Sequence, residues 1–124
     1  MSGGDWPVEL RLAKDRRLLT IAFEDGARFE LSAEMLRVMS PSAEVQGHTE
    51  AERKTVGGKR NVEIIRVEPV GNYAVRLVFD DMHDSGIFSW ALLRDLGVNG
   101  AQRFAAYLAD LAAKGLDRDK PGAK

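Results

Sequence analysis

The residues best suited to chemistry in this chain surround one histidine, His83. Three carboxylates stand close to it in the sequence, at Asp80, Asp81 and Asp84. Imidazole nitrogen and carboxylate oxygen are ligands that iron, zinc and manganese accept, and imidazole titrates near neutral pH. The segment therefore predicts a metal site. The same residues are also typical of a solvated turn after a strand, in which Asp and Ser side chains bond to nearby backbone. Both interpretations stay open at this point.

The second histidine of the chain, His48, lies far from His83 in the sequence. It could supply a second imidazole ligand if the segment around it folds back toward His83. Otherwise His48 is an exposed loop residue. Without it, one imidazole among scattered carboxylates specifies no coordination geometry. Any site built from these residues would hold iron or zinc weakly.

The composition excludes several chemistries. The chain has no cysteine, which removes disulfides, thiolate nucleophiles and thiolate-based zinc or iron–sulfur sites. A formal net charge of -1 gives no global field that would attract nucleic acid or anionic lipid. No apolar run reaches the length of a membrane span, and the N-terminal residues lack a signal-peptide pattern. We therefore expect a cytoplasmic location, without nucleic-acid or membrane partners.

No motif in the sequence predicts an enzyme. Residues 57–60 read Gly-Gly-Lys-Arg, but a phosphate-binding loop needs glycine where Arg53 stands and Ser or Thr where Arg60 stands. No Gly-x-Ser-x-Gly elbow surrounds any serine that could act as a nucleophile. With two histidines and no nucleophile–base arrangement, we expect a non-catalytic protein.

The elements that must position these residues begin with three strands. Apolar and polar residues alternate over 8–12, 19–23 and 28–31, and Gly26 marks a hairpin turn between the last two. Ser32 is placed to cap a short helix that runs to Met39. From Ser40 to Asn61 no hydrophobic period persists, which predicts a long loop.

The second half of the chain predicts two more strands and two helices. The strands span 62–67 and 74–79, and their β-branched residues make them candidates for central positions. A helix over 90–96 is capped by Ser89 and ends at Gly97, and Asn99 begins an amphipathic last helix. The order of elements predicts an α+β fold: one small domain with a largely antiparallel sheet and short helices packed on it.

We expect the domain itself to span residues 6–115. Residues 1–5 are predicted to be a flexible N-terminus, and residues 116–124 are predicted to be a flexible tail, because they combine charged residues with Pro121 and Gly122. At 124 residues the chain has the size of one ordinary domain.

Several separate blocks of the sequence resemble one known family. The longest are residues 36–48 and 80–90, and shorter matches cover 23–26 and 65–73. Together they resemble the gamma-butyrobetaine hydroxylase-like N-terminal domain family over about residues 6–97.

In that family the domain precedes the catalytic barrel of dioxygenases, is attached to plastid iron–sulfur scaffold ATPases, or occurs alone in bacteria as a protein of unknown function. The resemblance implies the standalone form here, because the chain leaves no room for the barrel. It therefore does not carry hydroxylase activity to this chain.

The resemblance also bears on metal binding. The eukaryotic hydroxylases hold a structural zinc through three cysteines and one histidine, and those positions fall on Ser40, Ser42, Val45 and His83 here. Serine hydroxyls and a valine cannot replace thiolates for Zn²⁺. The resemblance thus implies either a weak site of His83 with carboxylates or no metal, with His83 bonded into the loop around Ser40 and Ser42.

Two functions remain open from the sequence. The first is a non-catalytic accessory module that binds a protein partner through the face formed by residues 40–60 and the His83 segment. The family's different fusion partners favour it. The second is a metal-binding or metal-delivery protein linked to iron–sulfur assembly, with His83 and its neighbouring carboxylates as ligands.

Overall fold

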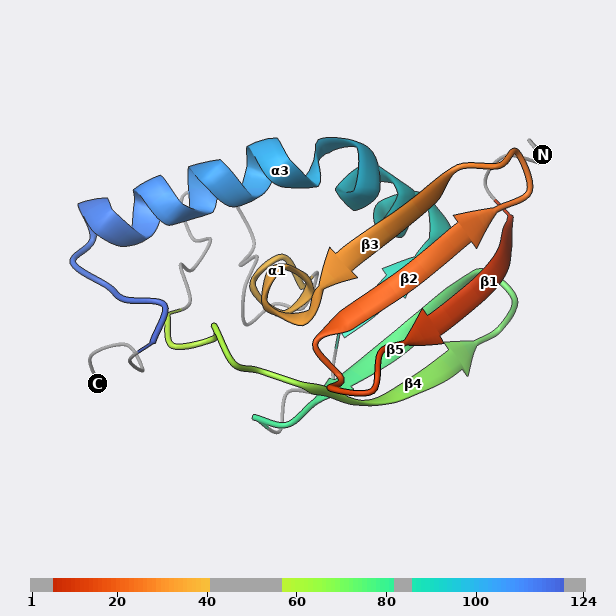
Figure 1. Ribbon diagram of the computed structural model, residues 1–124, viewed down its shortest axis with the longest axis horizontal. Helices are drawn as coiled ribbons and strands as arrows, with labels where there is room; N and C mark the ends of the chain where they lie inside the picture. The colour runs from red at the N-terminus through yellow and green to blue at the C-terminus, as the bar shows by residue number, and fades with distance from the viewer. Residues whose placement is uncertain (1–5, 41–56, 82–85, 120–124) are drawn as a thin grey trace.

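The computed structural model describes residues 6–40, 57–81 and 86–119. Within these ranges the chain forms two three-stranded antiparallel sheets and two helices (Figure 1). The elements in chain order are β1 (Pro7–Leu12), β2 (Leu18–Phe23), β3 (Arg28–Ser32), α1 (Ala33–Val38), β4 (Ile64–Val70), β5 (Ala74–Phe79), β6 (Gly86–Ser89) and α3 (Trp90–Ala113). The predicted α+β class with antiparallel strands is confirmed, although the strands are divided between two sheets rather than one.

The first sheet has the order β1-β2-β3 and contains the predicted hairpin. Gly26 takes a φ of 93°, a left-handed conformation that glycine adopts without steric cost. The side chain of Asp25 accepts a hydrogen bond from the Ala27 amide at 3.0 Å, which closes the turn. The turn chemistry read from the sequence therefore sets the pairing of β2 with β3.

The second sheet has the order β4-β5-β6, so β5 is central and β4 is an edge strand. The prediction that both were central is wrong for β4. Pro69 lies within β4, and proline is tolerated at an edge because it cannot donate a ladder hydrogen bond. The strand β6 was not predicted, because its four residues follow directly from the His83 segment and run straight into a helix.

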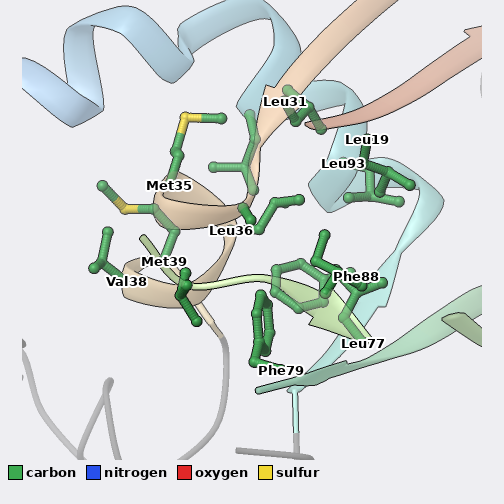
Figure 2. Packing of buried hydrophobic residues seen from close by; sticks show 14 of the residues in the cluster. Leu19, Leu31, Met35, Leu36, Val38, Met39, Leu77, Phe79, Phe88 and Leu93 are labelled. Atoms are coloured by element: carbon green, nitrogen blue, oxygen red, sulfur yellow. The ribbon is translucent and has the colours of Figure 1, made fainter. Parts of the chain in front are cut away.

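The core lies between the two sheets and α1 (Figure 2). Leu19 and Leu31 come from the first sheet, and Leu77, Phe79 and Phe88 come from the second; all five are at most 2% exposed. The alternation along β2 and β5 places one apolar face of each sheet in this core.

The helix α1 begins as predicted at Ser32, whose hydroxyl oxygen accepts a hydrogen bond from the Met35 amide at 3.0 Å. All six of its residues are buried, including Glu34 and Arg37. Buried charges require partners, because an ion that is buried without one loses its hydration, which costs several kcal/mol. Those partners define the site described below.

The helix α3 runs for 24 residues, where the sequence predicted two helices divided at Gly97. Ser89 caps it as predicted, with its hydroxyl accepting from the Leu92 amide at 3.1 Å. Gly97 does not end the helix but lies against the ring of Phe29. Asn99 does not cap a second helix: its side chain donates to Asp95 at 2.7 Å, one turn back in α3.

The residues after α3 contact the rest of the fold as far as they are described, and the flexibility of residues 116–124 stays a prediction. Leu116 packs against the core, and the backbone carbonyls of Asp117 and Arg118 accept hydrogen bonds from Gly58 and Arg60 at 2.8 and 3.0 Å. Residues 120–124, like residues 1–5, lie outside the described part of the chain.

Candidate functional site at the end of α1

Asp81 is the centre of a partly buried ion cluster. Its Oδ2 atom accepts hydrogen bonds from Arg37 Nε at 2.8 Å and from Lys59 Nζ at 2.5 Å. The three side chains are 4% (Arg37), 18% (Lys59) and 21% (Asp81) exposed. One carboxylate is therefore shared by two cations that come from different parts of the chain.

Three separate segments meet at this cluster. Arg37 lies in the last turn of α1, Lys59 precedes β4, and Asp81 follows β5. Burial alone would raise the pKa of the Asp81 carboxyl, but the hydrogen bond from Lys59 and the charge and hydrogen bond of Arg37 outweigh it. The pKa of Asp81 therefore lies below its usual value, and the ionised form is favoured.

Asp80 and Asp81 do not act together, although they are adjacent in the sequence. The Oδ1 atom of Asp80 accepts from the Glu63 amide at 3.1 Å, and the Asp80 amide donates to the Glu63 carbonyl at 2.9 Å. Asp80 thus bonds to Glu63 at the end of the β4–β5 ladder, while the Asp81 side chain bonds to Arg37 of α1.

Ser40 joins the same region from the end of α1. It is fully buried, and a Cβ atom built on Gly86 would lie 2.5 Å from the Ser40 hydroxyl oxygen. The start of β6 therefore approaches the end of α1 so closely that only glycine fits at position 86. We call the five residues Arg37, Ser40, Lys59, Asp81 and Gly86 the α1 corner.

The predicted metal ligands are only partly described. Among residues 6–40, 57–81 and 86–119, no three His, Asp or Glu side chains cluster in a way that could hold a metal ion. His48, His83 and Asp84, together with Ser42 and Val45, lie outside these ranges. The site that combines them with Asp80 and Asp81 stays a prediction.

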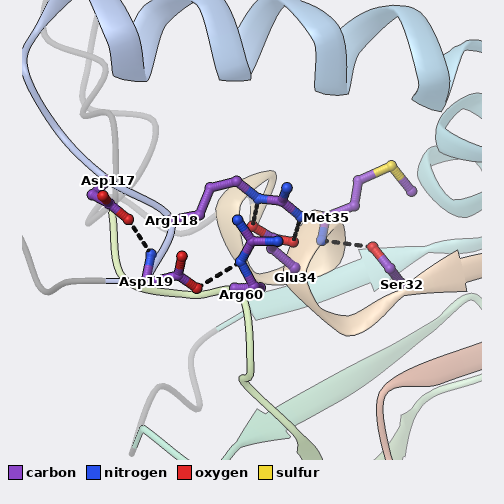
Figure 3. A network of polar contacts seen from close by, with 7 residues as sticks. All are labelled: Ser32, Glu34, Met35, Arg60, Asp117, Arg118 and Asp119. Atoms are coloured by element: carbon purple, nitrogen blue, oxygen red, sulfur yellow. Dashed lines mark hydrogen bonds and ion pairs between the residues drawn. The ribbon is translucent and has the colours of Figure 1, made fainter.

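A second polar cluster was not foreseen from the sequence (Figure 3). Glu34, whose side chain is 7% exposed, accepts two hydrogen bonds from Arg118, at 2.8 and 2.6 Å. Arg118 also lies over the ring of Phe104, 5.4 Å from its centroid. The two partners are 84 positions apart, so no local pattern could pair them.

Tyr107 of α3 lies beside this second cluster. Burial, and after it the negative charge of Glu34, raise the pKa of the Tyr107 hydroxyl to about 12. The hydroxyl is therefore neutral across the physiological range.

In the described ranges, no helix has both the length and the apolar character that crossing a membrane requires.

Comparison with known proteins identifies what the chain resembles. The family model described as gamma-butyrobetaine hydroxylase-like, N-terminal, matches residues 10–94. This match confirms the resemblance predicted over about residues 6–97. The search of curated proteins found no match.

Three solved structures are similar to this chain. One solution NMR structure is 43% identical, covers 98% of this chain and 95% of its own, and has a TM-score of 0.81. Another is 45% identical, with coverages of 96% and 89% and a TM-score of 0.79. A crystal structure from Acidithiobacillus ferrooxidans, described as a protein of unknown function in the DUF971 family, is 36% identical. It covers 78% of this chain and 98% of its own, with a TM-score of 0.66.

Proposed function

Because the chain belongs to the gamma-butyrobetaine hydroxylase-like N-terminal domain family, we propose that it is a non-catalytic accessory module that binds a protein partner at the surface around the α1 corner. The solved relative from Acidithiobacillus ferrooxidans is matched over 98% of its length, so a domain of this kind also occurs without a catalytic barrel in that structure. A module that is fused to different enzymes and also stands alone is suited to positioning or interaction rather than to one reaction.

The convergence of four chain positions at the α1 corner is the observation that carries this proposal. Ser40 and Gly57 border residues 41–56, and Asp81 and Gly86 border residues 82–85. Ser40 contacts Gly86, and Asp81 binds Lys59, which is two positions from Gly57. The described residues that border the two ranges therefore lie near one another.

The α1 corner joins four elements of the fold, which supports a role as a preorganised binding site. The Asp81 ion cluster joins α1, the approach to β4 and the end of β5, and the Ser40–Gly86 contact joins α1 to β6. Residues that already hold their bound arrangement in the free protein lose less conformational entropy when a partner binds.

Site-specific photo-cross-linking in cells tests the proposal. A photoreactive amino acid replaces Asn61, which is exposed and two positions from Lys59, and in a matched control it replaces Tyr73, which is 57% exposed. Tyr73 lies beyond the far end of β4, about 20 Å away at the usual rise of a strand.

The proposal predicts one discrete cross-linked protein from position 61 that is absent from position 73. The yield should fall when Asp81→Asn is combined with the probe at position 61. Equal cross-linking from both positions, or only diffuse products from position 61, would show that the α1 corner is not the binding surface.

A further inference from the structure

We propose that residues 116–119 form a strap that opens independently of the core and whose closure holds Lys59 against Asp81. The strap would then set the state of the α1 corner. This inference rests on the proposed function for the identity of the surface that is controlled. The backbone hydrogen bonds between the strap and residues 58–60 carry it. Figure 3 shows two side-chain contacts of the strap, Arg118 with Glu34 and Asp119 with Arg60.

The strap follows the C-terminal cap of α3, where the Leu116 amide donates to the Leu111 carbonyl at 2.9 Å. Gly115 has a φ of 69°, and no atom lies within 4 Å of the position that a Cβ would occupy there. A glycine in the left-handed region that ends a helix sets the direction of the chain that follows. The strap then runs beside α1 and forms backbone hydrogen bonds with Gly58 and Arg60.

Arg118 is the anchor of the strap. Its guanidinium forms two parallel hydrogen bonds with the buried carboxylate of Glu34 and lies over Phe104. Bidentate pairs of this kind are the strong charge-assisted type. Opening the strap therefore exposes Glu34 to water, and closing it gives this buried carboxylate its cation.

The remaining contacts of the strap are weaker. Arg60 and Asp119 form an ion pair at 2.6 Å, but their side chains are 45% and 53% exposed. Pairs at such exposure contribute little to stability. Within the strap, Leu116 is held by its packing against the core, whereas residues 117–119 are held by the Arg118 anchor, two backbone hydrogen bonds and exposed contacts. A segment with so few buried contacts is the kind that opens locally, below the free energy of global unfolding.

Lys59 is the link between the strap and the α1 corner. Its two neighbours, Gly58 and Arg60, donate their amides to the strap carbonyls of Asp117 and Arg118 at 2.8 and 3.0 Å. The strap thus holds the residue on each side of Lys59, while the Lys59 carbonyl accepts from the Val62 amide at 3.2 Å. The Nζ atom of Lys59 binds Asp81 at 2.5 Å. When the strap opens, Lys59 loses the backbone support that aims it at Asp81.

Amide hydrogen exchange measured by NMR on the full chain tests whether the strap opens separately. In the unmodified protein, the amides of Gly58 and Arg60 should exchange with a lower protection than those of Ile21 in β2 and Leu77 in β5. This measurement needs no substitution. Equal protection at all four amides would mean that residues 58–60 open only by global unfolding, and the independent strap would be disproved.

Substitution of the anchor tests the coupling to Asp81. Arg118→Gln should raise the exchange rates of Gly58 and Arg60 at least about tenfold and leave Ile21 unchanged. It should also move the pKa of the Asp81 carboxyl upward, toward the value found in Lys59→Met, which removes the lysine directly. The matched control is Arg103→Gln, which breaks an ion pair with Asp95 on α3 at exposures of 44% and 34% and should change none of these readouts.

Faster exchange at Gly58 and Arg60 with no change in the Asp81 pKa would overturn the coupling, since the strap would open without releasing Lys59. If Arg118→Gln fails to fold, the protection pattern of the unmodified protein still decides whether the strap opens. Cross-linking from position 61 does not depend on either result, so failure of the strap and failure of the proposed function are distinguishable.

Discussion

Gly97 of α3 lies against the face of Phe29 in β3, so that a Cβ atom at position 97 would be 2.3 Å from Phe29 Cγ. The same Cβ would lie 2.6 Å from both Cδ atoms, so the whole ring would have to move. Glycine allows α3 to continue over the edge of the first sheet at this point. The close approach fixes the helix against β3, which leads directly into α1.

Gly97→Ala is therefore expected to destabilise the protein. Alanine gains about 1 kcal/mol in helix propensity, but forcing a methyl group into a filled space costs about 1–3 kcal/mol. We expect a net loss of about 1 kcal/mol in the free energy of unfolding, measured by urea denaturation. Gly100→Ala is the matched control, because its Cβ would meet the flexible Met35 side chain at 2.9 Å, and it should be nearly neutral. A stabilised Gly97→Ala protein would contradict the close contact with Phe29.

The prediction of two helices in place of α3 is wrong, and it shows what local sequence patterns cannot reveal. The caps at Ser32 and Ser89 and the turn at Gly26 were predicted correctly, because each depends on bonds within a few residues. Gly97 has the residue type of a helix end, but its role is set by Phe29, which lies far away in the sequence. Local propensity gives the wrong answer where tertiary packing needs a small residue.

The candidate site could likewise be predicted only in part from the sequence. The sequence singled out Asp81 and its neighbours, but it could not show that Arg37, 44 positions away, binds Asp81 rather than solvent. The Glu34–Arg118 pair gave no signal at all, because an acidic residue in the first helical turn is already explained by the helix dipole. Only the fold shows that its carboxylate is buried.

Asp81→Asn should destabilise the protein by about 2–3 kcal/mol at pH 7, because it removes the charge that balances buried Arg37. The pKa of Asp81 is depressed in the folded state, so its contribution is present above the unfolded pKa of about 3.9. It is lost as the pH falls through the folded pKa. Urea denaturation between pH 2 and 7 should show the difference between Asp81→Asn and the unmodified protein shrinking toward the acid side.

Asp80→Asn is the control for that experiment. Its side chain can still accept the hydrogen bond from the Glu63 amide, and we expect a change within about 0.5 kcal/mol. A larger loss at Asp80 than at Asp81 would show that the ladder end, and not the ion cluster, holds this region together.

The raised pKa of the Tyr107 hydroxyl predicts that the folded protein loses stability at alkaline pH. Its pKa is about 12 when folded, against about 10 when unfolded, so the unfolded chain loses this proton first. The stabilisation is therefore complete below pH 10 and declines as the pH rises toward 12. Tyr107→Phe should remove up to about 2 kcal/mol of this dependence. Thermal unfolding at pH 8 to 11 measures it, and parallel curves for the two proteins would exclude Tyr107 as the cause.

The interaction-module proposal predicts that Zn²⁺ does not stabilise the chain. Ser40 stands at one of the positions where the resemblance implies a cysteine, and its buried hydroxyl lies against Gly86. A neutral hydroxyl is a poor zinc ligand, and the Asp81 carboxylate is already bound by Arg37 and Lys59. Titration to 1 mM Zn²⁺, and anaerobically to 1 mM Fe²⁺, should leave the melting temperature unchanged within about 1 °C. A saturable rise that His83→Ala abolishes and His48→Ala retains would instead favour metal binding or delivery as the function.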